Sequence, residues 1–291
     1  MSFIDIHGHY AWNIDDGIPS YEDARKALEL ARENRISAIV ATPHVTPGVH
    51  TKDDIHDFIQ RIDDLRMLAT EYNIDILDGC ELFLNHDYQK ALDQNLFIPI
   101  ENTQYVLVEF DVRKEIGNEQ EVEERLYDVQ FKGYTPIIAH VERYFKNGLD
   151  IERVNGFIES GCIIQVNATS FLGYHGKQAK KIAFQLLDEG LIHVIATDTH
   201  RATGSRKPCL NKIFYDRHVE DVILLACAAR DKGLEDDGGF KTHGLRHRDA
   251  VDRDALFMGI GMRRVGDLLL LQNAHDVGFF FFILCHFGFL L

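Results

Sequence analysis

Residues 3–9 read Phe-Ile-Asp-Ile-His-Gly-His, a short β-branched run that ends in two histidines. The apolar part, Phe3 to Ile6, predicts a strand, and the alternation of side chains along an extended chain places His7 and His9 on the same side. An isolated His-x-His pair is a weak signal for a metal site. The prediction of a metal site becomes stronger because similar apolar runs, also followed by a histidine or an acid, recur along the chain.

Six further runs predict strands at Ala38 to Ala41, Ile74 to Leu77, Tyr105 to Val108, Pro136 to Ala139, Ile163 to Val166 and Val194 to Thr197. Amphipathic stretches between the strands predict helices at Ser20 to Asn34, Lys52 to Glu71, Glu119 to Lys132, Ile151 to Ser160 and Lys177 to Glu189. This alternation of strands and helices is typical of an α/β protein with a parallel sheet. Because no dinucleotide-type glycine fingerprint is present, the pattern favours a closed or nearly closed barrel.

Nearly every predicted strand is followed by a side chain of a type that binds metal ions. The candidate ligands are His7, His9, Asp16, His44, Glu81, Glu109, His140, Asp198 and His200. We expect His44 at the end of the second strand and Glu81 at the end of the third. The carboxyl ends of barrel strands converge on one face, so these side chains are expected to meet in one pocket.

Imidazoles and carboxylates without a thiolate suit Mn²⁺, Fe²⁺ or Zn²⁺, and so large a set is sufficient for two or three ions. Clustered ions generate hydroxide near neutral pH and neutralise phosphate oxygens. Arg143 and Arg206 follow His140 and His200 closely, and a guanidinium can bind two phosphate oxygens at once. An arginine on a solvated loop is the ordinary alternative, but beside a metal cluster both become candidate catalytic residues.

Composition narrows the class of protein. The 291 residues include 31 Lys plus Arg against 46 Asp plus Glu, a formal net charge of -15, which disfavours nucleic acid as a partner. Five cysteines without a CxxC pair, and an N-terminus unlike a signal peptide, indicate the cytoplasm.

Residues 214–291 lack the alternation of strand and helix patterns found in residues 1–213 and form an atypical C-terminal segment. Its aromatic end, Phe279 to Leu291, is too short to span a bilayer as a helix, so no stable membrane insertion is expected.

Taken together, the motifs resemble those of the PHP-type (polymerase and histidinol phosphatase) bacterial protein-tyrosine phosphatases of capsule and exopolysaccharide synthesis. The matching segments are Ile4-Asp5-Ile6-His7-Gly8-His9, Asp15-Asp16-Gly17, Ala41-Thr42-Pro43-His44, Gly79-Cys80-Glu81, Val108-Glu109-Phe110, Ala139-His140-Val141-Glu142-Arg143, Gln165-Val166-Asn167 and Ala196-Thr197-Asp198-Thr199-His200, followed by Arg206. They are collinear over residues 3 to about 210, and the Asp15-Asp16-Gly17 turn is typical of this branch. After about Ile213 the closing helix and Asn-Pro segment of the family are absent.

The resemblance implies a distorted (β/α)7 barrel with three metal ions, usually manganese. It implies that the nine candidates are ligands, with Glu81 as a bridge, and that Arg143 and Arg206 orient the phosphate. It further implies hydrolysis of phosphotyrosine on a bacterial tyrosine autokinase that controls polysaccharide polymerisation, by in-line attack of metal-bound hydroxide on phosphorus.

Two alternatives remain open at the level of sequence. The first is a phosphatase for a small phosphomonoester such as histidinol phosphate, built on the same barrel, because a shared fold does not fix the substrate. The second is a catalytically silent metal-binding scaffold.

Overall fold

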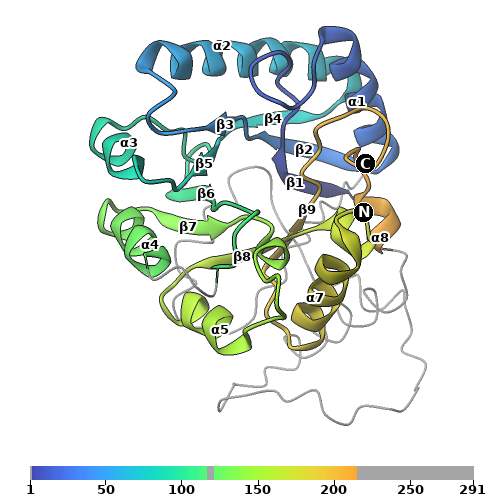
Figure 1. Cartoon of the computed structure of the whole chain (residues 1–291). Coiled ribbons are helices and arrows are strands. Elements are labelled where there is room, and N and C mark those ends of the chain that lie inside the picture. Colours follow the sequence, from blue (N-terminus) through green and yellow to red (C-terminus); the bar gives the residue numbers. More distant parts are fainter. Residues whose placement is uncertain (1, 117–120, 215–291) are drawn as a thin grey trace, which may run out of the picture.

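A ring of parallel strands surrounded by helices forms the body of the protein (Figure 1). The computed structural model describes residues 2–116 and 121–214. The expected C-terminal segment, residues 214–291, therefore lies outside the described residues except for its first position. The ring confirms the predicted α/β class with a parallel sheet.

The described strands form two parallel sheets. The first has the order β1-β2-β4 and consists of β1 (Phe3–Gly8), β2 (Ile36–Ala41) and β4 (Asp75–Asp78). The second runs in the order β3 (His44–Val45), β5 (Glu81–Phe83), β6 (Tyr105–Glu109), β7 (Thr135–Ile138), β8 (Ile163–Asn167) and β9 (Val194–Ala196). A parallel bridge between Gly8 and Thr199 joins β1 to the chain beyond β9, so the ring closes.

Two of the seven predicted strands, Ala38 to Ala41 and Ile74 to Leu77, are each followed, after a break, by a separate short strand. The expectation that His44 and Glu81 end the second and third strands is wrong, because these residues begin β3 and β5. Pro43 has no N–H to donate to a ladder, which interrupts the first of these strands. At the second break a Cβ on Gly79 would lie 2.6 Å from Val40 Cγ1, so glycine allows the chain to pass close to β2 there.

The helices lie outside the ring (Figure 1). Those that the sequence predicted are α1 (Tyr21–Glu33), α2 (Lys52–Ala69), α4 (Val122–Phe131), α5 (Ile151–Glu159) and α7 (Gly176–Asp188). Those that it did not predict are short, namely α3 (Tyr88–Gln94), α6 (Ala168–Phe171), α8 (Leu210–Phe214) and the 3-10 helices η1 (Thr70–Tyr72) and η3 (Val141–Arg143). At the start of α1, Ser20 Oγ accepts a hydrogen bond from Asp23 N at 3.1 Å, as an N-cap does.

The interior of the ring is filled with apolar side chains. Ile6, Val40, Leu77, Leu107 and Ile137 come from five different strands and belong to one buried cluster. A second, larger cluster packs the outer faces of the strands against the helices. Because the interior is packed, polar side chains from several strands can meet only at an end of the ring. Among the described helices none combines the length and the apolar character that crossing a membrane requires.

Asp5 stabilises the seam at which the ring closes. Its buried carboxylate accepts hydrogen bonds from Thr197 N at 2.9 Å and from Thr197 Oγ1 at 2.5 Å. Asp5 lies on β1 and Thr197 follows β9, so these bonds hold together strand ends that are 192 positions apart in sequence.

We predict that Asp5→Ala lowers the free energy of unfolding by about 1–3 kcal/mol, because it leaves the buried N–H of Thr197 without an acceptor. Urea denaturation followed by circular dichroism measures the change. Asp75→Ala, at an exposed position of β4, is the matched control. If the two variants unfold at the same urea concentration, Asp5 does not hold the seam.

Candidate metal centre

The candidate ligands lie together at one end of the ring, where the strands deliver their carboxyl ends. Eight of them fall into four overlapping groups of three whose potential ligand atoms lie within 4.8 Å of one another: His9, His44 and His200; His7, His9 and Asp198; His7, Glu81 and His140; and His44, Glu81 and Glu109. The remaining candidate, Asp16, has Oδ1 3.2 Å from His44 Nε2 and 3.4 Å from His200 Nε2. The structure thus brings together all nine side chains.

Glu81 occupies the middle of this cluster. Its Oε2 lies 3.1 Å from His7 Nε2, 3.2 Å from His9 Nε2 and 3.2 Å from His44 Nδ1. Its Oε1 lies 2.9 Å from His140 Nε2. The carboxylate is buried, so one group from the start of β5 faces imidazoles that come from three other parts of the ring.

Hydrogen bonds on the outer sides of two imidazoles determine which ring nitrogens face the cluster. His7 Nδ1 lies 3.1 Å from Gln165 Oε1, and His9 Nδ1 lies 2.7 Å from Asp15 Oδ2. Both oxygens are acceptors, so each Nδ1 donates its proton outward, and in the neutral ring each Nε2 presents a lone pair inward. The two Nε2 atoms are 3.3 Å apart. Paired lone pairs beside a carboxylate are the arrangement that a divalent cation requires.

Three buried atoms of the cluster have no hydrogen-bond partner, namely His140 Nδ1 and the two atoms that face each other, Glu81 Oε2 and His44 Nδ1. A buried polar atom without a partner is costly, and a bound cation would satisfy both of the facing atoms. With nitrogen and oxygen donors only, the residues fit a catalytic divalent ion and not a structural Cys-ligated zinc.

The charges of the cluster also favour a cation. Burial alone would lower the pKa of His7, but the adjacent carboxylates of Glu81 and Asp198 raise it to about 9. Burial and the neighbouring charge of Glu81 raise the pKa of Glu109 to about 7. Protons therefore bind more tightly to both groups than usual, and divalent ions would displace those protons on binding.

A chain of hydrogen bonds supports the ligands from the side of β8. Gln165 Oε1 accepts from His140 N at 2.8 Å, and Gln165 Nε2 donates to Asn167 Oδ1 at 2.9 Å. Asn167 Nδ2 in turn donates to Asp198 Oδ2 at 2.7 Å. The two amides therefore position candidate ligands. They also link His7, His140 and Asp198, which come from three different strand ends.

The loop after β1 is held by two residues outside the set of candidate ligands, Asp15 and Arg201. Asp15 Oδ2 accepts from His44 N at 3.0 Å, in addition to its contact with His9. Arg201 Nη1 donates to the main-chain oxygens of Asp16, Gly17 and His200 at 2.5, 2.6 and 2.7 Å. Asp15 belongs to the Asp15-Asp16-Gly17 turn identified in the sequence, whereas the contacts of Arg201 with that turn span up to 185 positions and follow from no local pattern.

The backbone is strained at two of the candidate ligands. His140 and Asp198 have φ values of 35° and 52°, in the left-handed region that non-glycine residues rarely adopt. Asp198 N donates to His7 O at 2.9 Å, which fixes this conformation at the seam of the ring. Strain of this kind is tolerated where surrounding contacts determine the conformation, as they do here.

The two candidate catalytic arginines lie on either side of Asp198. Arg206 Nη2 is 3.1 Å from Asp198 Oδ1 and 2.7 Å from His200 Nε2. Arg143 Nη1 is 3.5 Å from Asp198 Oδ2. Both side chains are partly exposed, and the side chain of Asp16 is 64% exposed, so this side of the cluster is open to solvent. Two cationic side chains therefore lie beside the solvent-exposed side of the cluster.

The sequence of this chain is similar to those of a known protein family. Residues 3–220 match the model of the family described as capsular polysaccharide synthesis, CpsB/CapC. The tyrosine-protein phosphatase YwqE of Bacillus subtilis is 30% identical over 199 residues, which are 68% of this chain and 77% of the relative. The tyrosine-protein phosphatase CpsB of Streptococcus pneumoniae is 28% identical over 221 residues, 72% of this chain and 88% of the relative.

The fold of this chain is also similar to that of a solved structure. One chain from the crystal structures of YwqE and CpsB, described there as unique metal-dependent tyrosine phosphatases, superposes with a TM-score of 0.62 at 26% identity. The match covers 80% of this chain and 88% of that chain. With the family model spanning most of the chain and the candidate ligands gathered at the end of the ring, the protein belongs to the CpsB/CapC family of capsular polysaccharide synthesis.

Proposed function

We propose that this protein is a metal-dependent protein-tyrosine phosphatase. The observation that carries the proposal is the overlap of four potential ligand groups at one end of the ring, next to two arginines. The activities of YwqE and CpsB support it. As the physiological substrate we propose the phosphotyrosine of a bacterial tyrosine autokinase that regulates capsular or exopolysaccharide synthesis.

We further propose that the cofactor is a set of three divalent ions, with manganese the preferred metal and iron or zinc as the alternatives. The proposed ligands are His7, His9, Asp16, His44, Glu81, Glu109, His140, Asp198 and His200. Glu81 is the proposed bridge, since both of its oxygens face imidazoles. Bound ions of this kind supply Lewis acidity, which activates water and neutralises phosphate oxygens.

The protein's own side chains would perform the remaining steps. Arg143 and Arg206 bind the phosphate oxygens, and their charges oppose the negative charge of the transition state. Gln165 and Asp15 hold His7 and His9 in the tautomer that presents Nε2 to the centre. Because a phenolate is a good leaving group, departure of the tyrosyl oxygen requires little assistance from a general acid.

Two further proposals concern the whole chain. Residues 1–213 would form the catalytic domain, because every proposed ligand and both arginines lie within it. Residues 214–291 would form a separate C-terminal segment. A cytoplasmic location is supported by Cys80, Cys162 and Cys209, which are free and buried.

We predict that His140→Ala and Arg143→Ala differ in kind. The first removes a nitrogen that faces Glu81 and should lower the metal content of the purified protein. The second should keep the metal and lower kcat/KM by about a hundredfold or more, as the loss of a transition-state donor does. Elemental analysis and steady-state kinetics on the same preparations measure both effects.

Exposed residues of the same types provide controls for these variants. His56→Ala and Arg32→Ala, on α2 and α1, should match the wild type in metal content and in turnover. Equal loss of metal in His140→Ala and Arg143→Ala would contradict the separate roles of ligand and phosphate-binding residue.

A side-by-side assay distinguishes the proposed substrate from a small phosphomonoester. With Mn²⁺ present, we expect kcat/KM for a phosphotyrosine peptide to exceed that for histidinol phosphate by about tenfold or more. A chelator should abolish the turnover of both and of p-nitrophenyl phosphate. A preference for histidinol phosphate would refute the tyrosine phosphatase assignment. A fully metallated protein without chelator-sensitive turnover would instead be a metal-binding scaffold.

A further inference from the structure

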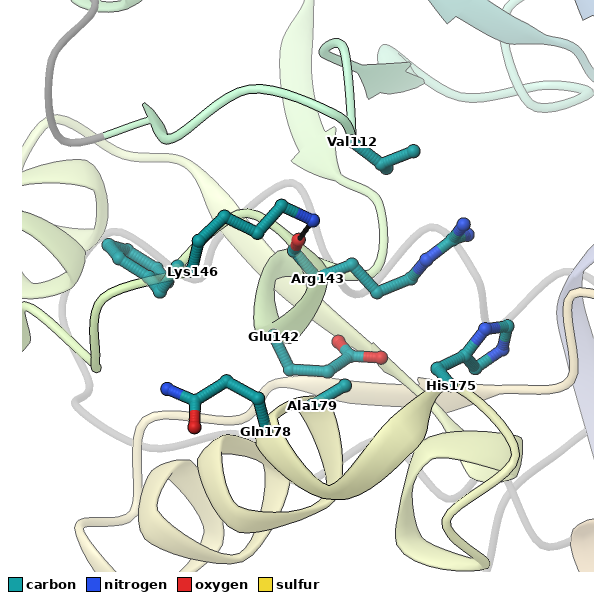
Figure 2. Close-up of a pocket in the computed structure, with 8 residues that line it drawn as sticks. Val112, Glu142, Arg143, Lys146, His175, Gln178 and Ala179 are labelled. Atoms are coloured by element: carbon teal, nitrogen blue, oxygen red, sulfur yellow. Dashed lines mark hydrogen bonds between the residues drawn. The ribbon is translucent and has the colours of Figure 1, made fainter.

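A small cavity lies directly beside the candidate metal centre and has no role in the proposed hydrolysis. Its volume is about 190 Å³. We call it the Arg143 pocket, and its polar lining consists of Glu142, Arg143, Lys146, His175 and Gln178 (Figure 2). Val112 and Ala179 contribute apolar wall. The residues come from the segment after β6, from η3, from the turn after η3 and from the region of α7, so the pocket is formed between separate parts of the chain.

Arg143 connects this pocket to the metal centre. The guanidinium lines the pocket and also places Nη1 3.5 Å from Asp198 Oδ2, a candidate ligand. In Figure 2 the Arg143 side chain extends over the pocket toward the side where His175 lies. A molecule whose phosphate contacts Arg143 at the metal centre therefore has its adjacent atoms at the mouth of the Arg143 pocket.

The exposed part of the lining is cationic and rich in hydrogen-bond donors. Lys146 Nζ donates to Arg143 O at 3.2 Å, which uses one of its three N–H bonds. Gln178 is exposed on α7 and offers an amide. The single carboxylate, Glu142, is 1% exposed and accepts through Oε1 from Asn167 N and Ser170 Oγ. A ligand thus meets two cationic groups, Arg143 and Lys146, while the one acid is held in the wall.

The size of the pocket restricts what it can hold. A helix with its side chains is about 10–12 Å across, too wide for a cavity of about 190 Å³. One side chain of an extended segment fits, and a donor-rich, cationic lining favours a carboxylate.

We propose that the Arg143 pocket binds the residue next to the phosphotyrosine in the protein substrate and selects an acidic side chain there. This inference rests on the proposed tyrosine phosphatase function and specifies its substrate class. Lys146 and Gln178 are then residues that determine specificity and do not take part in hydrolysis.

The test compares phosphotyrosine peptides that differ only in whether glutamate or lysine flanks the phosphotyrosine. For the wild type we expect kcat/KM to be about two- to fivefold higher with glutamate, within the range for exposed charge pairs. The preference should fall toward one at about 1 M salt, where the Debye length is about 3 Å. Lys146→Glu should abolish or reverse it, and Gln178→Glu should weaken it, with p-nitrophenyl phosphate turnover unchanged in both.

Lys181→Glu is the matched control, because it changes the total charge equally from an exposed position of α7 that does not line the pocket. Affinities for the same peptides carrying a non-hydrolysable phosphonate, measured by fluorescence anisotropy, report the preference without turnover. Equal kcat/KM and affinity for the two peptides in the wild type would overturn the inference, as would equal effects of Lys146→Glu and Lys181→Glu. Absence of p-nitrophenyl phosphate turnover would instead overturn the proposed function, while the affinities would still decide on the pocket.

Discussion

The buried carboxylate of Glu81 is the group on which the centre depends. It lies among imidazoles from three other parts of the ring, and its Oε2 has no hydrogen-bond partner. In a low-dielectric interior such an arrangement needs positive charge, which either protons or divalent ions can supply. The neighbouring carboxylates of Glu81 and Asp198 raise the pKa of His7 to about 9, so they favour positive charge at this position. Without a cation, the buried carboxylate makes the cluster energetically costly. For the same reason, the cluster is a strong site for metal.

The barrel concentrates these polar groups at one end because apolar side chains fill the rest of its interior. The interior cluster fills the ring, so polar groups from different strands meet only where the strands end. Two breaks in the strands change the path of the backbone at that end of the ring. The chain leaves β2 at Pro43 and β4 near Gly79, and the short strands that follow begin with His44 and Glu81. Left-handed backbone at His140 and Asp198 makes a similar adjustment at two other strand ends.

Rigid support extends well beyond the ligands. Gln165, Asn167 and Asp15 fix tautomers and orientations, and Arg201 ties the loop of Asp16 to the segment after β9. Loss of an orienting partner of this kind typically lowers metal affinity or activity by about 10- to 100-fold. Arg143 has a second position in this arrangement, because it faces both the metal centre and an adjacent cationic pocket. In the proposed function, this one side chain would couple phosphate binding to recognition of the surrounding substrate.

The sequence by itself determined the strands, the long helices and the identity of the candidate ligands. Apolar runs such as Phe3 to Ile6 and capping residues such as Ser20 act locally, and parallel strands necessarily deliver His7, Glu109 and Asp198 to one end. Only the tertiary structure decided the broken strands, the hydrogen bond from His7 to Gln165 across 158 positions and the role of Arg201. Each of these depends on how distant segments pack against one another, and neither hydrophobic period nor residue spacing contains that information.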